Sequence, residues 1–182
     1  MSVGPRVVLR TFRETDVEAL YDLMADVRTI GDFWPLRIGS AEQWLKRYRD
    51  DFWWTDEFGR LLLTDRSDRP LGYVNYFKAG NSYDGLEIGY RIFDPEDRGA
   101  GYMSEAVPLF VSFLFSAKKV EHIQALIHPE NRGSQRIAEK TGFVCEGTMR
   151  RACYNRGEYH DLRIYSILRE DVPPLSAHLD SV

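Results

Sequence analysis

Residues 87–106 read EIGYRIFDPEDRGAGYMSEA, an apolar strand that passes through a glycine-bearing loop and into a helix. A helix start leaves backbone N–H groups unpaired and carries a partial positive charge. Gly99 and Gly101 let the loop backbone adopt unusual angles and approach a ligand closely. The stretch therefore predicts a strand–loop–helix unit whose backbone can cradle a phosphate group.

A glycine turn that only starts a helix is the simpler interpretation of the same residues. The spacing does not match the dinucleotide fingerprint G-x-G-x-x-G, because Ser104 occupies the position of the third glycine. The loop also lacks the G-x-x-x-x-G-K-[ST] pattern of nucleotide triphosphate loops. A dinucleotide fold and an ATPase are therefore disfavoured, and a nucleotide-binding protein is kept only as a minor alternative.

Strand and helix patterns extend on both sides of this unit. Capping boxes at Thr15–Glu18 and Ser40–Gln43 predict the starts of two helices. Pro108 is expected to kink its helix or to leave a carbonyl near Ser104 without a partner. We expect strands at 7–12, 60–65, 71–78, 86–93, 120–127, 143–153 and 159–168, and later helices at 101–117 and 134–140.

This βααβββαβαββ order predicts the α/β (α+β) fold class, with one mixed, twisted sheet of about six to seven strands and about four helices. The strand–helix–strand unit over residues 86–127 predicts a locally parallel strand pair. The hairpins around it predict antiparallel partners, and the helices are expected on both faces of the sheet.

Length and composition suit one compact domain, since the chain has 182 residues and 43% of them are hydrophobic. We expect that domain over residues 1–172 and a loosely ordered tail over residues 173–182. A net charge of -4 gives no general attraction to nucleic acid or to an anionic membrane. The longest apolar run, at 107–115, is too short to span a bilayer.

The two cysteines, Cys145 and Cys153, form no C-x-x-C or Cys/His cluster, so no metal site is expected. Residues 1–13 lack the long apolar stretch of a signal peptide. These features predict a cytoplasmic protein with reduced thiols.

The glycine loop resembles the Q/R-x-x-G-x-G/A signature of the GNAT acetyltransferases, present here as Glu96-x-x-Gly99-x-Gly101. Further segments resemble the RimJ/RimL-type branch of that family, namely 101–106 (GYMSEA), 129–134 (PENRGS), 139–143 (EKTGF), 160–161 (HD) and 165–168 (YSIL). The resemblance spans residues 7–171. Glu96 departs from the signature. Because an acid facing a pyrophosphate is unfavourable, we expect its side chain to point to solvent.

The resemblance implies a single GNAT-like domain whose central parallel strands splay apart around the pantetheine arm of acetyl-CoA. Backbone groups near Ile92 and Phe93 would hold the pantetheine amides, and Asn131 would hydrogen-bond the same arm. Arg136 would reach the 3′-phosphate, or would be an ordinary solvated helix charge. The pyrophosphate would be held by the backbone of Arg98, Gly99, Ala100, Gly101, Tyr102, Met103 and Ser104.

The reaction implied by the resemblance is direct attack of a neutral amine on the thioester of acetyl-CoA, the cosubstrate. It needs a proton acceptor for the ammonium, backbone donors for the oxyanion and a proton source for the leaving thiolate. Glu87, on the strand beside the thioester, is the first candidate base. Alternation places it on one face with Gly89 and Arg91, and a salt bridge to Arg91 is its structural alternative.

Two further residues carry candidate catalytic roles. Ser134 is either the proton donor to sulfur or a helix N-cap. His128 follows a strand that borders the cleft, and it is either a proton relay or a structural histidine.

Aromatic residues are expected around the amine acceptor. The resemblance places the acceptor pocket near Phe33 and Trp34 and near residues 52–54, and aromatic faces can hold a cationic amine. Alternatively, these segments cover the sheet edge or form a homodimer contact. Tyr154 and His160 either line the pocket or lie on a surface hairpin.

The acceptor is left open between a protein N-terminal amine and a small amine such as an antibiotic or a polyamine. Asp32, Asp51 and Asp56 lie near the aromatic segments in the sequence and would favour a cationic substrate. The alternative function is a non-catalytic acyl-CoA-binding or regulatory module on the same fold. No nucleic-acid or membrane partner is expected.

Overall fold

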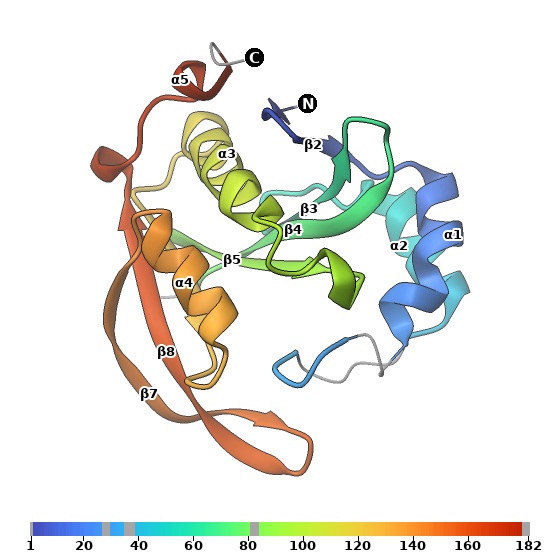
Figure 1. Ribbon diagram of the computed structural model, residues 1–182. Coiled ribbons are helices and arrows are strands. Elements are labelled where there is room, and N and C mark those ends of the chain that lie inside the picture. Colours follow the sequence, from blue (N-terminus) through green and yellow to red (C-terminus); the bar gives the residue numbers. More distant parts are fainter. Residues whose placement is uncertain (1, 27–29, 35–38, 81–83, 180–182) are drawn as a thin grey trace.

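The computed structural model describes residues 2–26, 30–34, 39–80 and 84–179 (Figure 1). Within them, an eight-stranded sheet has the order β1-β2-β3-β4-β5-β6-β8-β7. The strands are β1 Ser2–Val3, β2 Val7–Thr11, β3 Phe58–Asp65, β4 Pro70–Lys78, β5 Gly85–Ile92, β6 His122–Ile127, β7 Val144–Asn155 and β8 Glu158–Leu168. The helices are α1 Glu14–Ala25, α2 Ala41–Asp51, α3 Tyr102–Ala117, α4 Arg132–Lys140 and α5 Ser176–Leu179, with single 3-10 turns η1 Pro95–Asp97 and η2 Arg169–Asp171.

The predicted parallel pair is formed by β5 and β6, and its ladder is short. Only Gly85 to Glu87 of β5 pair with His122 to Gln124 of β6. Beyond that point β5 continues to pair with β4 as far as Ile92, while β6 continues with β8 as far as Ile127. The two strands therefore diverge toward their C-terminal ends, which confirms the mixed sheet with splayed central strands.

Helices cover both faces of the sheet, as predicted (Figure 1). Leu61 and Leu63 of β3 belong to the core beneath α3, whereas Leu62 belongs to the core beneath α1 and α2. This alternation is the strand period of two. It shows that the central strands are buried on both sides, so the sheet can hold a ligand only where two strands separate.

Helix starts differ from the predictions in two places. α1 begins at Glu14, where the carboxylate of Asp16 accepts the amide of Arg13 over 2.7 Å, so Thr15 is not the cap. α2 begins as predicted, because Ser40 Oγ accepts the Gln43 amide over 3.2 Å. α4 begins at Arg132 rather than at residue 134, because the side chain of Asn131 takes the capping position.

Two further features bear on the site. α3 continues through Pro108, and because proline has no N–H, the carbonyl of Ser104 lacks its usual helical donor. β7 and β8 form a long hairpin that projects from one end of the sheet (Figure 1). In the described part of the chain, every helix is too short or too polar to cross a membrane.

Candidate functional site

A cleft of about 570 Å³ opens where β5 and β6 diverge. Its walls come from these two strands, from the loop before α3, from the first turns of α3 and α4, and from residues 30–34. It brings together residues predicted for the cosubstrate, for catalysis and for the acceptor. They are Phe33, Trp34, Ile92, Arg98, Gly99, Gly101, Tyr102, Met103, Ser104, His128, Asn131, Ser134 and Arg136.

The backbone of β5 presents unpaired polar groups to this cleft. The amide of Phe93 donates to the carbonyl of Leu71 over 2.9 Å, so it faces β4 and is not free to hold a ligand as predicted. In an antiparallel pair, alternate residues turn both backbone groups away from the partner strand. Tyr90 and Ile92 therefore direct their amides and carbonyls into the gap. Ile88 contributes its carbonyl alone, because its amide takes part in the last pairing of β5 with β6. Ile92 keeps its predicted place, and Phe93 does not.

The glycine loop has the conformation that its sequence suggests. Gly99 and Gly101 have φ of 79° and 87°, a region that side-chain-bearing residues rarely adopt, and Gly101 is the N-cap of α3. Of the described loop residues, Ala100 is not among those that line the cleft, and its carbonyl accepts a hydrogen bond from Arg6 Nη1 over 2.9 Å. A Cβ on Gly101 would lie 3.1 Å from Arg6 Nη2. The loop is thus held open by an arginine from the start of the chain.

Positive charge dominates this end of the cleft. Arg98, Arg136 and Lys140 line it together with Asp97. Asp97 accepts hydrogen bonds of 2.8 and 3.0 Å from Arg69, which largely neutralises its carboxylate. Glu96 is exposed and is not among the described residues that line the cleft. This agrees with the prediction that its side chain points to solvent. The arrangement suits an anionic ligand.

Asn131 and Ser134 have different roles at the start of α4. Asn131 Oδ1 accepts the amide of Ser134 over 3.1 Å, so Asn131 is the N-cap and Ser134 is not. The hydroxyl of Ser134 is therefore left outside the helix cap, at the cleft wall. The hydroxyl of Tyr90 donates to the carbonyl of Ser134 over 3.1 Å. Burial raises the pKa of Tyr90, so its phenol stays protonated beside the cleft.

Glu87 lies at the closed end of the divergence, and among the described residues it is not part of the cleft wall. Gln124 Nε2 donates to Glu87 Oε2 over 2.9 Å, and burial raises the pKa of this carboxyl. Alternation along β5 is as predicted, because a Cβ on Gly89 would lie 3.0 Å from Trp34, on the face that carries α1. Arg91 points the same way and donates to the carbonyls of Met24 and Leu23.

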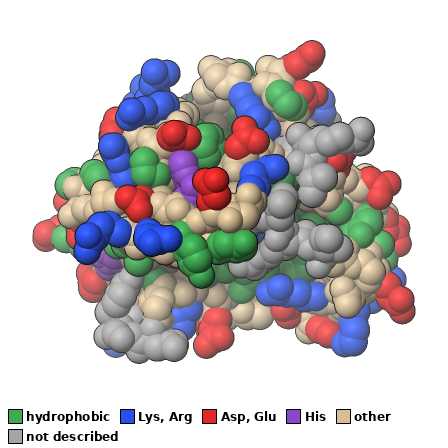
Figure 2. Space-filling model, turned by 90° about the horizontal axis from the view of Figure 1, so that it is seen from below, with side chains coloured by type: hydrophobic (Ala, Val, Ile, Leu, Met, Phe, Trp, Pro, Cys, Tyr) green, Lys and Arg blue, Asp and Glu red, His purple; other side chains and the backbone are tan. Residues whose placement is uncertain are grey.

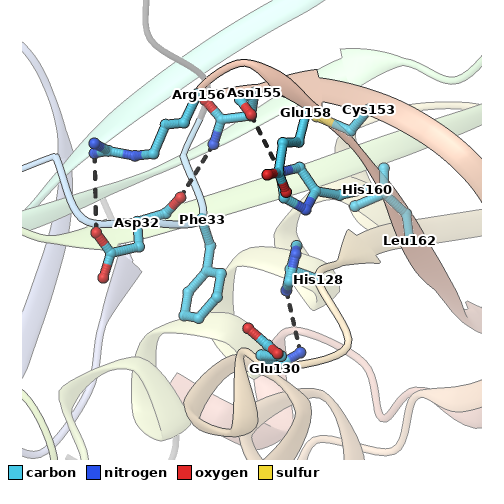
Figure 3. A pocket seen from close by; sticks show the side chains of 10 residues that line it. All are labelled: Asp32, Phe33, His128, Glu130, Cys153, Asn155, Arg156, Glu158, His160 and Leu162. Carbon is cyan, nitrogen blue, oxygen red and sulfur yellow. Dashed lines mark hydrogen bonds and ion pairs between the residues drawn. The ribbon is translucent and has the colours of Figure 1, made fainter.

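A second pocket of about 240 Å³ adjoins the mouth of the cleft (Figure 3). His160 lines this pocket and not the main cleft, while Asp32, Phe33, His128 and Leu162 line both. The remaining lining residues are Glu130, Cys153, Asn155, Arg156 and Glu158. The predicted acceptor residues Phe33 and His160 are therefore joined through His128.

The imidazoles of His128 and His160 lie with ring centroids 5.0 Å apart, and the ring of Phe33 lies 4.8 Å from that of His128. His128 Nδ1 accepts the amide of Glu130 over 3.1 Å. His160 Nε2 lies 3.1 Å from the carbonyl oxygen of Asn155. Each ring therefore uses one nitrogen to bind backbone and keeps the other for the pocket.

Other aromatic predictions fall outside the site. Tyr154 is 62% exposed and packs against Tyr159, with ring centroids 5.1 Å apart, so it lies on the surface hairpin. Trp53 is buried in the core beneath α1 and α2, and Trp54 packs on Tyr76. Trp53 and Trp54 thus contribute to packing, whereas Phe52 is 65% exposed beside Tyr48, and none of the three is among the residues that line either pocket.

The acidic residues near those aromatics are also used elsewhere, apart from Asp32 at the pocket. Asp51 Oδ1 accepts the amide of Trp53 over 2.7 Å, and Asp56 forms an ion pair with Lys118 at 2.8 Å. Across the described ranges, His, Cys, Asp and Glu side chains form no group of three or more that could hold a metal ion.

Arg6 and Tyr90 are site residues that the sequence patterns did not reveal. Arg6 contacts the loop across 94 residues of chain, and no local spacing encodes such a contact. Tyr90 had a signal, since it alternates with Ile88 and Ile92 along a strand predicted to border the cleft.

A mixed sheet whose parallel strands diverge over a glycine-loop anion cradle is the architecture of an acetyltransferase. The family model described as "Acetyltransferase (GNAT) domain" matches residues 6–144. The chain therefore belongs to the GNAT family and is an N-acetyltransferase-type enzyme.

Known relatives agree with this assignment. The chain is 27% identical over 167 residues to the uncharacterized N-acetyltransferase YoaA of Bacillus subtilis, covering 90% of this chain and 94% of that protein. It is 21% identical to the ribosomal-protein-serine acetyltransferase of Escherichia coli, covering 91% and 94%. The structure of spermidine N-acetyltransferase from Vibrio cholerae with CoA and spermine has a similar fold, with a TM-score of 0.79, 19% identity and coverage of 91% and 96%.

Proposed function

We propose that the chain transfers the acetyl group of acetyl-CoA to a primary amine by direct attack in a ternary complex. The observation that carries this proposal is the continuous path from the glycine loop, along the unpaired edge of β5, to the pocket at His128. The path has an anion site at one end and an amine-sized pocket at the other. Structures of related proteins with bound CoA support the choice of cosubstrate.

The residues that would hold the cosubstrate follow from the geometry of the cleft. The loop amides at 98–104 would take the pyrophosphate, because they lie at the start of α3, where backbone N–H groups have no helical partner. Arg136 and Lys140, one turn apart on α4, would reach the 3′-phosphate. Backbone groups of β5 that face the gap would bind the pantetheine amides. Asn131 uses Oδ1 to cap α4, and its Nδ2 would donate to the same arm.

Catalysis would depend on a proton source near the thioester sulfur. Ser134 is well placed for this role, since its hydroxyl is not used as a helix cap and its position lies on the cleft wall. Unpaired amides of β5 would stabilise the oxyanion. Glu87 lies away from the cleft and is a weaker candidate for the base than the histidines at the mouth.

The acceptor is proposed to be a cationic primary amine. The small pocket carries the carboxylates of Asp32, Glu130 and Glu158, and only Arg156 offsets them there. Named relatives act on both classes considered above, because one is a spermidine N-acetyltransferase and another a ribosomal-protein-serine acetyltransferase. A polyamine and a protein N-terminus both present an ammonium group that fits this description.

A CoA-thiol release screen across primary amines tests the proposal. The panel should contain spermidine, an aminoglycoside and a peptide with a free N-terminus, each with mass spectrometry for one added acetyl group. Acetylation of any of these amines is the expected result. Tight CoA binding without turnover would instead support the non-catalytic binding module, and thermal stabilisation by ATP or NAD but not by CoA would overturn both.

A further inference from the structure

The two histidines at the acceptor pocket are not equivalent as proton acceptors. Each binds one backbone group, but His128 meets an amide and His160 meets a carbonyl (Figure 3). An amide N–H only donates, and a carbonyl oxygen only accepts. The backbone therefore determines which nitrogen of each ring carries the proton.

His128 is held as a donor toward the pocket. Its Nδ1 accepts the Glu130 amide over 3.1 Å, so that nitrogen is unprotonated and Nε2 carries the hydrogen. Protonation of the ring would place a hydrogen on Nδ1, against the hydrogen of the Glu130 amide. Taking up a proton would thus break the existing hydrogen bond, which disfavours His128 as a base.

His160 is held in the opposite sense. Its Nε2 donates to the carbonyl of Asn155 over 3.1 Å, which leaves Nδ1 with a free lone pair in the neutral ring. When Nδ1 takes up a proton, the bond to Asn155 persists and becomes charge-assisted. Figure 3 shows the unused nitrogens of His160 and His128 pointing toward one another across the pocket.

We propose that Nδ1 of His160 is the general base that accepts the ammonium proton of the acceptor, with Nε2–H of His128 as a hydrogen-bond donor opposite it. This proposal rests on the acetyltransferase function proposed above and names a residue for its deprotonation step. Asn155 has 7% of its surface exposed, so the carbonyl that orients His160 is shielded from competing water.

The proton balance of the step is complete. The ammonium gives one proton to His160 Nδ1, and the neutral nitrogen then attacks the carbonyl carbon of the thioester. The C–N bond forms and the C–S bond breaks. The second nitrogen proton passes to the CoA sulfur, and His160 returns its proton to solvent through the open pocket.

The charges around the pocket favour this step. Figure 2 shows one face of the molecule, on which acidic and basic side chains are interspersed. The ionisable groups that line the small pocket with His160 are Asp32, His128, Glu130, Cys153, Arg156 and Glu158. The carboxylates among them outnumber the one arginine, so they would attract the ammonium of the acceptor.

The test compares His160→Ala, His160→Gln and His128→Gln with wild-type protein, using the best amine from the screen. With His160→Ala we expect kcat to fall about 100-fold, within the range for loss of a general base, while CoA affinity stays unchanged. The acidic limb of the kcat profile should disappear in both His160 variants. Added imidazole should restore activity to His160→Ala, because the deleted ring leaves space beside the pocket.

His128→Gln is expected to lower kcat while keeping the acidic limb, and imidazole should not rescue it. Thermal unfolding and CoA titration show whether each variant is folded. Unchanged kcat and pH profile in a folded His160→Ala would overturn the inference, and so would a loss that imidazole does not restore. If wild-type protein acetylates no amine, the proposed function fails instead, which separates the two outcomes.

Discussion

The side-chain amide of Gln124 donates to Glu87 Oε2 over 2.9 Å at the point where β5 and β6 still pair. This carboxyl is the first candidate base from the sequence, yet it lies outside the cleft wall. We therefore expect Glu87→Gln to change kcat by less than about threefold, a small loss of transition-state stabilisation. A CoA-release assay checks this, and a drop comparable to that of His160→Ala would restore Glu87 as the base.

Glu87→Gln should also change how the free energy of unfolding depends on pH. Burial raises the pKa of Glu87, so the folded state penalises the charged form. The penalty appears as the pH rises past the unfolded-state pKa and is complete above the folded-state pKa. Glu87→Gln should then be more stable than wild type at pH 8, with the difference shrinking toward pH 4, the ordinary range of a carboxyl. Denaturant unfolding of both proteins at several pH values measures this difference in the free energy of unfolding.

Replacing Ser134 separates its two predicted roles. Because Asn131 supplies the cap of α4, Ser134→Ala should leave the free energy of unfolding within about 0.5 kcal/mol of wild type. If the hydroxyl donates a proton to sulfur, kcat should fall by about 100-fold, with CoA affinity unchanged. Steady-state kinetics and CoA titration report these quantities separately.

Asn131→Ala is the matched control at the same helix start. It removes the cap and should cost about 1 kcal/mol of stability, and it should weaken CoA binding. A Ser134→Ala variant that loses stability in the same way, but keeps its kcat, would show that the serine is structural.

The cosubstrate half of the site could be predicted from the sequence because it is local. The loop at 98–104 and the start of α3 depend on glycine conformations and helix-end chemistry over a few consecutive residues. The resemblance named Asn131, which lies on the cleft wall, although its role as a cap was not foreseen.

In the acceptor half, the sequence named Phe33, His128 and His160 but not how they are held, because that half is assembled by tertiary contacts. The carbonyl of Asn155 orients His160 through a contact that no pattern of residue types encodes. The contact of Arg6 with the glycine loop, in the cosubstrate half, is of the same long-range kind. Trp53 is a further example, because the sequence of an aromatic segment is the same whether the segment lines a pocket or packs in a core.

Gly101 and Gly99 allow the anion cradle to be tested by paired substitutions. Both have left-handed φ, so alanine at either position should cost about 1 kcal/mol of stability. Only at Gly101 would the new Cβ meet a neighbour, Arg6 Nη2 at 3.1 Å, while nothing lies within 4 Å at Gly99. Gly101→Ala should therefore displace Arg6 from Ala100 and weaken CoA binding at least about fivefold more than Gly99→Ala does, about 1 kcal/mol. Calorimetric titration with CoA measures the affinity of each variant. Equal affinities would exclude a role for the Arg6 contact in CoA binding.

The ion pair between Arg10 and Asp16 should make stability depend on pH. Both side chains are largely buried, and Asp16 accepts two hydrogen bonds of 2.7 and 3.0 Å from Arg10. Burial opposes ionisation of Asp16, but the hydrogen bonds from Arg10 and from the Arg13 amide outweigh it and lower the pKa of the carboxyl. Asp16→Asn should cost about 2 kcal/mol at pH 7, because it removes the charge-assisted hydrogen bonds to Arg10, which keeps its ion pair with Asp68 at 2.7 Å.

A lowered folded-state pKa stabilises the protein above the ordinary pKa of the carboxyl, and this contribution is lost as the pH falls below it. The difference in free energy of unfolding between wild type and Asp16→Asn should thus be constant from about pH 8 to pH 5. It should become smaller below about pH 4. The exposed pair of Lys46 and Asp50 provides the control, since Asp50→Asn should change stability by less than about 0.5 kcal/mol. Urea unfolding at each pH measures these differences. If the stability difference is just as large at pH 3, the asparagine at position 16 destabilises the protein through packing and not through loss of charge.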